Sequence, residues 1–124
     1  MSARTALVLA AALMFAAVAL GAFGAHALKA RLAPDMQAIW QTAVQYHAWH
    51  ALGLLAVGLV ALVRPEASVA LAGGLFVAGI LLFSGSLYAM ALTGARGFGV
   101  ITPFGGVAFL AGWLAFAWRV SRIA

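Results

Sequence analysis

Residues 67–95, ASVALAGGLFVAGILLFSGSLYAMALTGA, contain no charged side chain. A helix rises about 1.5 Å per residue, so about 20 apolar residues cross the roughly 30 Å of bilayer hydrocarbon. Residues 5–28, 36–63 and 97–118 are also uncharged and long enough. Hydrocarbon offers the backbone no hydrogen bonds and the alternation of a β-barrel is absent, so each stretch must be helical. The sequence predicts an all-α integral membrane protein with four transmembrane helices, near residues 5–25, 43–63, 69–92 and 103–120.

The connections between these spans are about 17, 5 and 10 residues long, and short connections join antiparallel neighbours. We therefore expect a single domain, residues 1–124, folded as an up-down antiparallel four-helix bundle. Pro34 and Asp35 are typical of a first helical turn, which would start the second helix at the membrane surface. Pro65 should end that helix, and Thr102 is a candidate N-cap for the last one.

The composition excludes several classes of protein. The chain is 67% hydrophobic and 7% charged, whereas a soluble domain carries about 25% charged residues. Because there is no cysteine, disulfides, iron–sulfur clusters and thiolate catalysis are excluded. The net charge of +5 is scattered at the segment ends rather than gathered in a patch, which argues for contact with the lipid bilayer and against nucleic acid as a partner.

Charge placement also bears on mechanism and orientation. The two acids, Asp35 and Glu66, fall in the connections, so proton-coupled antiport through an acid inside the membrane is disfavoured. The predicted side of the membrane that holds both chain ends carries four basic residues and the other side carries three. The four are Arg4, Arg64, Arg119 and Arg122, and the three are Lys29, Arg31 and Arg96. The positive-inside rule then predicts that both termini are cytoplasmic.

Polar side chains gather toward one end of the predicted bundle. His47 and His50 are three residues apart on one helix, and His26 lies at a similar level on the preceding helix. Three histidines could bind zinc or supply axial ligands to haem, but no recognised metal spacing accompanies them, so they are weak candidates and we expect no cofactor. We expect instead neutral imidazoles that make interhelical hydrogen bonds near the membrane interface.

Other side chains suggest membrane anchoring and close helix packing. Gln37, Gln41 and Gln45 form a stripe on the second helix that we expect to be solvated at the interface. The aromatic residues Trp40, Tyr46, Trp49, Trp113 and Trp118 resemble interfacial belts, although Trp113 lies deeper than a belt requires. Small residues recur every fourth position at Ala17, Gly21, Ala25, at Ala70, Gly74, Ala78, and at Gly85, Ala89, Thr93. Such stripes permit close helix contact within one chain or between chains.

Several stretches together resemble a known family. They are residues 21–28, GAFGAHAL, residues 40–52, WQTAVQYHAWHAL, residues 83–88, FSGSLY, with Thr93-Gly94, and residues 101–106, ITPFGG. The chain is similar from about Leu20 to Trp113 to the domain of unknown function 423 family of small bacterial inner-membrane proteins, which is related to transmembrane protein 256. The resemblance implies a four-span inner-membrane protein of unestablished biochemical role, and it supplies no catalytic residue.

The motif positions are the natural candidates for a polar site. They are His26, Gln45, Tyr46, His47, His50, Ser84, Ser86, Tyr88 and Thr102, with Pro103 beside the last. The leading hypothesis is a noncatalytic accessory or interaction subunit, not an enzyme, whose polar patch combines His26, His47, His50, Ser84 and Tyr88. Its partner would be another membrane protein or further copies of the chain. The alternative is an oligomeric small-solute transporter or ligand-binding membrane protein, and a metal- or haem-binding protein is a third reading.

Overall fold

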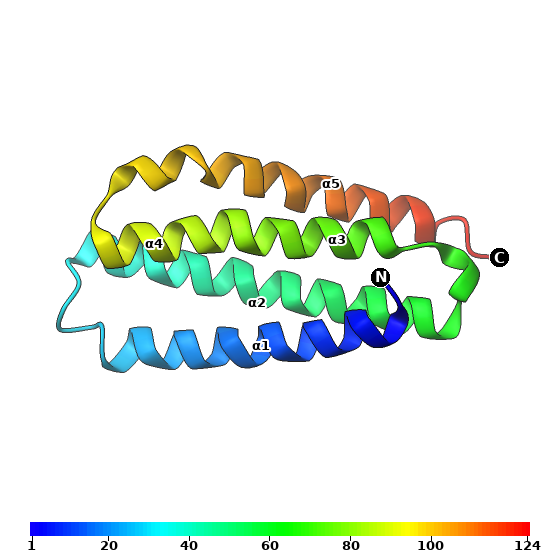
Figure 1. The fold of residues 1–124 in the computed structure, drawn as a ribbon, viewed down its shortest axis with the longest axis horizontal. Coiled ribbons are helices and arrows are strands. Elements are labelled where there is room, and N and C mark those ends of the chain that lie inside the picture. The colour runs from blue at the N-terminus through cyan, green and yellow to red at the C-terminus, as the bar shows by residue number, and fades with distance from the viewer.

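A computed structural model describes all residues, 1–124, and contains helices but no strands. Four of its rods are long and apolar enough to cross a membrane, which confirms the predicted all-α class. The elements are α1 (Ala3–His26), α2 (Pro34–Val63), the 3-10 turn η1 (Pro65–Ala67), α3 (Ala70–Gly79), the π-helix η2 (Ile80–Ser84), α4 (Gly85–Thr93), the 3-10 turn η3 (Arg96–Val100) and α5 (Thr102–Val120). The segments α3, η2 and α4 form one continuous rod (Figure 1).

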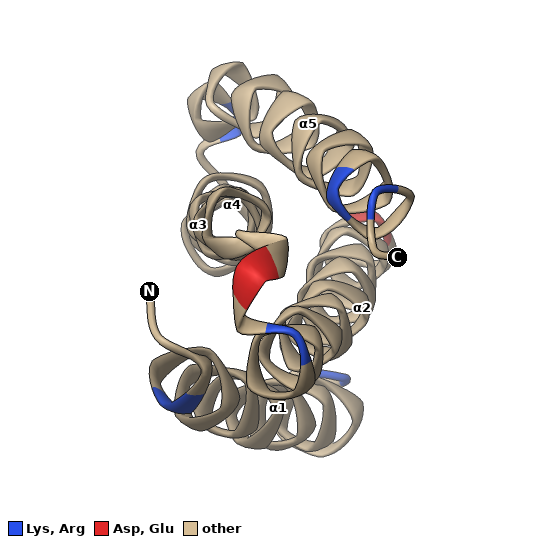
Figure 2. Ribbon diagram, turned by 90° about the vertical axis from the view of Figure 1, so that its right-hand side faces the viewer, with Lys and Arg blue, Asp and Glu red and all other residues tan.

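The rods run antiparallel in chain order. Both termini lie at one end of the bundle with the α2–α3 turn, and the α1–α2 and α4–α5 connections lie at the other end (Figure 1). Seen from the terminal end, α2 and the α3–η2–α4 rod are central, with α1 beyond one side and α5 beyond the other (Figure 2). The main contact of α1 is with α2, and that of α5 is with α3 and η2.

Polarity is distributed as a membrane protein requires. All nine charged side chains are exposed and lie at or beyond the ends of the rods, as the terminal end shows (Figure 2). The outward faces between them carry large apolar side chains, such as Phe15, which is 78% exposed, and Leu114, which is 73% exposed. Such a surface is stable against lipid and unstable against water.

The helix boundaries differ from the predicted ones at two places. The helix α2 begins at Pro34, with Asp35 in its first turn, so the proposed start signal is correct and the loop before it is only residues 27–33. The prediction that Thr102 caps the last helix is wrong. Ile101 before α5 already has helical dihedral angles, φ −79° and ψ −35°, because η3 leads directly into α5, and an N-cap requires extended backbone.

Glycines allow the rods to approach closely. A Cβ on Gly105 of α5 would fall on the main chain of Phe83 in η2, and one on Gly79 would fall on the ring of Phe109. By contrast, Gly74 of the predicted small-residue stripe on α3 faces open space. Close contact inside the bundle therefore depends on glycines that the four-residue stripes did not single out.

Candidate functional site

The imidazole of His47 joins α2 to α4. It is only 4% exposed, and its Nδ1 lies 2.9 Å from the hydroxyl oxygen of Tyr88. Either atom can be the donor in this bond, according to the tautomer of His47. The other ring nitrogen, Nε2, is buried without a hydrogen-bond partner of good geometry, and the main chain of Leu13 in α1 lies on its side. A buried polar atom without a partner destabilises the fold.

His50, one turn further along α2, has both nitrogens paired. The carbonyl of Tyr46 lies 2.7 Å from Nδ1, so Nδ1 carries the proton and donates. Nε2 is then the acceptor for the indole N–H of Trp113 on α5, at 3.0 Å. The ring also stacks on Phe109, with 3.5 Å between ring centroids. One neutral tautomer satisfies every contact, which fixes the orientation of this imidazole.

The π-helix η2 directs the two serines to different partners. Ser84 is fully buried, and its hydroxyl donates to the carbonyl of Ala43 on α2 at 2.8 Å. Ser86 donates to the carbonyl of Phe83 at 2.9 Å, which leaves its oxygen to accept from the hydroxyl of Thr102 on α5, 2.6 Å away. A π turn holds one residue more than an α turn and so changes the facing of the residues that follow it.

The predicted patch does not assemble as a single site. His26 is exposed at the end of α1, with no hydrogen bond or ring contact to His47, His50, Ser84 or Tyr88, because α1 ends there and the chain turns away. No three histidine or acidic side chains lie close enough to bind a metal ion, so the three-histidine arrangement is not formed.

The histidine pairs lie well away from both ends of α2. His50 is sixteen residues after Pro34 and thirteen before Val63, which places it about 24 Å and about 20 Å along the axis from the two ends of α2. The polar pairs of His47 and His50 are therefore near the middle of the helix α2, and their position relative to the membrane interface stays a prediction.

The α1–α2 contact divides the glutamine stripe and removes one tryptophan from the expected belt. Gln37 donates to the carbonyl of Gly24 at 2.8 Å, one of the carbonyls at the end of α1 that lack a helical partner. The indole N–H of Trp40 donates to the carbonyl of Leu20 at 2.9 Å, and this side chain is only 2% exposed. Trp40 is thus a packing residue, because the missing Cβ of Gly24 makes room for its ring.

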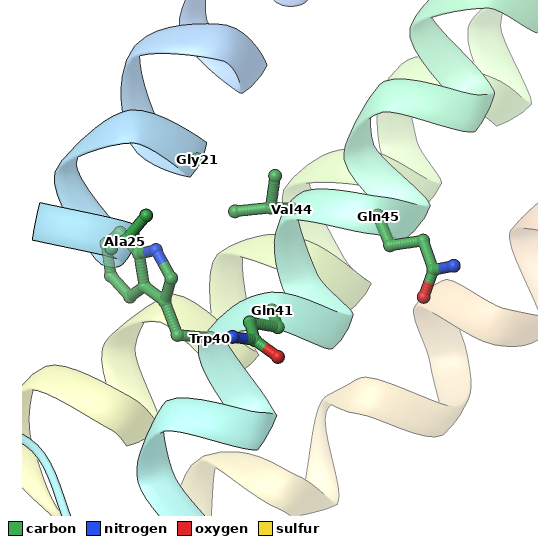
Figure 3. A pocket seen from close by; sticks show the side chains of 7 residues that line it. Gly21, Ala25, Trp40, Gln41, Val44 and Gln45 are labelled. Carbon is green, nitrogen blue, oxygen red and sulfur yellow. The ribbon is translucent and has the colours of Figure 1, made fainter. Parts of the chain in front are cut away.

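Gln41 and Gln45 remain exposed beside a shallow groove between α1 and α2. The groove has a volume of about 250 Å³ and its α1 wall is made of Gly21, Gly24 and Ala25. Trp40 reaches toward α1 while the amide of Gln45 extends away from it (Figure 3). We refer to this region as the α1–α2 groove.

Sequence reasoning missed the partners rather than most of the polar residues. Trp113 was noted only for its depth, and it is the donor to His50. Tyr46 packs between Trp49 and Phe83, with ring centroids 5.1 Å and 4.6 Å away, and its hydroxyl makes no hydrogen bond within the chain. A functional role for the nine candidate residues stays a prediction.

Comparison with known proteins identifies relatives along most of the chain. A family model described as "Protein of unknown function (DUF423)" matches residues 20–106. The UPF0382 membrane protein YwdK of Bacillus subtilis is 50% identical over 99 residues, 79% of this chain and 80% of the relative. The UPF0382 membrane protein SERP0230 of Staphylococcus epidermidis is 49% identical over 98 residues, 79% of this chain and 80% of the relative.

A further relative extends the match. The UPF0382 inner membrane protein YgdD of Escherichia coli is 43% identical over 114 residues, 91% of this chain and 86% of the relative. No solved structure matches the chain. The three relatives are named as membrane proteins, and none of the names states an activity.

Proposed function

The chain belongs to the DUF423 family of membrane proteins, and from that premise we propose that it is a noncatalytic interaction subunit whose α1–α2 groove receives a transmembrane helix of a partner protein. The observation that carries the proposal is the pair of glutamine amides, Gln41 and Gln45, exposed on the outer surface of α2. Membrane helices associate through close packing at small residues and through interhelical hydrogen bonds, and this groove offers both.

The interior polar groups support a structural role for themselves. His50, Ser84, Ser86 and Thr102 all have hydrogen-bond partners inside the bundle. Every charged side chain is exposed, so no acid or base with a formal charge reaches the interior. These groups hold helices together, whereas the amides of Gln41 and Gln45 are exposed beside the α1–α2 groove and available to another molecule.

The position of Gln45 along α2 makes its amide a group that needs a hydrogen-bond partner. The helix α2 has 30 residues and is therefore about 45 Å long, so a hydrocarbon layer of about 30 Å centred on it begins about 7 Å from either end. Gln45 is eleven residues after Pro34, about 16 Å along the helix and about 9 Å inside the hydrocarbon. An amide there is costly unless it is paired.

The wall of the groove fits a helix as its occupant. Gly21, Gly24 and Ala25 present almost no side chain on α1 (Figure 3), which allows the backbone of another helix to approach closely. The partner helix would carry a polar side chain opposite Gln41 or Gln45. Each such hydrogen bond contributes only about 0.6 kcal/mol on average, so packing in the groove supplies most of the affinity and the amides supply the register.

A photo-crosslinking residue at position 45 tests this role in native membranes. We expect a specific crosslinked product that mass spectrometry identifies as a second membrane protein. The same residue at position 114, a lipid-facing site that is 73% exposed on α5, is the matched control and should give no such product. Gln41→Leu, with the crosslinker kept at position 45, should reduce the yield about threefold or more, as the loss of a hydrogen bond of about 0.6 kcal/mol predicts.

Three outcomes would contradict the proposal. Crosslinks solely between copies of this chain would replace the heteromeric role with self-association. Equal crosslinking at positions 45 and 114, or recovery of the protein alone in mild detergent, would remove the groove as a docking surface.

Orientation is part of the same proposal. We place the protein in the bacterial inner membrane, the location that the name of the Escherichia coli relative gives for that relative. We also place both termini in the cytoplasm. The support is that the end of the bundle with the termini carries four basic side chains and the other carries three. A fluorescent reporter that folds only in the cytoplasm, fused after Ala124, should fluoresce, whereas a periplasm-active phosphatase fused there should be inactive. Phosphatase activity at this end would reverse the assignment.

A further inference from the structure

A second groove, separate from the docking surface, lies between α2 and α5. Its volume is about 550 Å³, more than twice that of the α1–α2 groove. Aromatic side chains make most of its walls, with Tyr46 and Trp49 from α2, Phe83 from η2, and Phe109 and Trp113 from α5. We call it the aromatic groove, and its volume lies in the range of small-molecule sites in proteins.

The walls of the aromatic groove are held in place by their own contacts. His50 is fixed through both nitrogens and stacks on Phe109 at 3.5 Å. The ring of Trp113 packs on Phe76 with centroids 4.7 Å apart. A site whose walls are rigid pays less ordering entropy on binding than one that must form around its ligand.

The groove opens sideways toward lipid. Val107 and Leu110 on its α5 rim are 64% and 68% exposed. Gly106 of α5 also lines the groove and carries no side chain, and a Cβ there would stay 3.9 Å from Phe83. An occupant can therefore enter from the bilayer and leave an apolar tail in it.

The hydrogen-bonding inventory of the aromatic groove selects the chemistry of that occupant. The hydroxyl of Tyr46 and the indole N–H of Trp49 line the groove and have no partner within the chain. The one imidazole acceptor, Nε2 of His50, is taken by Trp113. No charged side chain lines the groove. The groove thus offers two free donor groups, no charge and no free imidazole, which favours a neutral ligand that supplies hydrogen-bond acceptors.

The position of Tyr46 within the bilayer decides which kind of molecule can supply a hydrogen-bond acceptor to it. Tyr46 is twelve residues after Pro34, about 18 Å along α2 and about 10 Å inside a centred hydrocarbon layer. The ester carbonyls of glycerolipids lie at the boundary of that layer, and their acyl chains have no acceptor to offer deeper. A planar carbonyl compound that dissolves in the hydrocarbon reaches this depth, and its ring fits against aromatic walls.

We infer that the aromatic groove binds the ring of an isoprenoid quinone. One ring carbonyl accepts from the hydroxyl of Tyr46, the ring lies against the aromatic walls, and the isoprenoid tail passes Val107 and Leu110 into the bilayer. The inference concerns binding alone. It rests on α2 and α5 and is independent of the partner proposed for the α1–α2 groove.

Photolabelling in lipid nanodiscs tests the inference with an arylazido derivative of decylubiquinone as the probe. We expect saturable labelling of peptides that contain Tyr46 or residues 103–113, displaced by unmodified decylubiquinone. Tyr46→Phe removes one donor oxygen and should raise the concentration needed for half-displacement about five- to tenfold. Gly106→Leu fills the groove and should abolish labelling, whereas Gln45→Ala on the other surface should leave it unchanged.

Three results would overturn the inference. They are labelling spread evenly over all lipid-facing surfaces, equal displacement by decanol, which has the chain but no ring, and unchanged displacement in Tyr46→Phe. Because Tyr46→Phe keeps the ring, it decides the question if Gly106→Leu does not fold. Loss of the crosslink at position 45 with normal quinone labelling would reject only the proposed partner, and the reverse pattern would reject only the quinone.

Discussion

Replacing Gly105 with alanine is expected to destabilise the bundle strongly, although alanine is the better helix former. In an exposed helix, glycine to alanine stabilises by about 0.5 to 1 kcal/mol. At position 105 the new Cβ would meet the main chain of Phe83, with the Phe83 Cα only 2.7 Å away. Backbone cannot move aside as a side-chain end can, so α5 must separate from η2. Overpacking of this kind costs about 1 to 3 kcal/mol, and a main-chain clash belongs at the upper end.

The adjacent glycine is the matched control for this prediction. Gly106→Ala places its Cβ 3.9 Å from Phe83, an ordinary contact, so it should be neutral or slightly stabilising. Unfolding in mild detergent, followed by circular dichroism, should therefore give a clearly lower Tm for Gly105→Ala than for Gly106→Ala. Equal Tm values for the two variants would show that α5 does not pack as closely on η2 as described.

The second large effect is expected from His50→Phe. Phenylalanine keeps the ring that stacks on Phe109 but removes the acceptor for the indole N–H of Trp113. Trp113 is 42% exposed, but the bilayer offers its N–H no water as a substitute partner, and a donor left without a partner away from water costs about 1 to 3 kcal/mol. We expect a destabilisation in that range, with the contact between α2 and α5 loosened.

A double-mutant cycle separates the hydrogen bond from packing. Trp113→Phe removes the donor, and the double variant has neither partner, so its loss should be smaller than the sum of the two single losses. The coupling free energy should lie between about 0.6 and about 1.7 kcal/mol, the average and the upper limit for hydrogen bonds between membrane helices. If the double variant lost as much stability as the two single variants together, the hydrogen bond between His50 and Trp113 would contribute nothing specific.

The four rods could be predicted because each follows from the composition of a single continuous stretch of sequence. An uncharged stretch long enough to cross the bilayer has no alternative to a helix, and Pro34 with Asp35 marks the start of α2 correctly. The π-helix η2 could not be predicted in this way, because Ile80 to Ser84 contains no residue type that demands an extra residue in the turn. Its stability comes from tertiary packing and from the bond between Ser84 and the Ala43 carbonyl.

The candidate site was predictable in its residues and not in its geometry. His47 pairs with Tyr88 across helices, as two candidate residues. The partners of Ser84 and His50 are instead the carbonyl of Ala43 and the indole of Trp113, which the sequence does not mark as partners. His26 was misplaced because depth along the chain does not say which way a side chain faces at the last turn of a helix. Trp40 was wrongly assigned to the interfacial belt. The space that its ring fills is left by the missing Cβ of Gly24 on the preceding helix, and the sequence does not show that these two residues meet.

The order of contacts bears on how the chain is assembled during synthesis. The α1–α2 hairpin leaves the ribosome first and already contains its own polar links, from Gln37 and Trp40 to the end of α1. The second hairpin likewise contains the link between Ser86 and Thr102. The bonds of His47, His50 and Ser84 cross the seam between these halves in its interior. Arg96 pairs with Asp35 across the seam at one end of the bundle, and Arg64 donates to the carbonyl of Ala124 at the other. Apolar helix faces can slide along one another, so these polar links together set the axial alignment of the two finished halves.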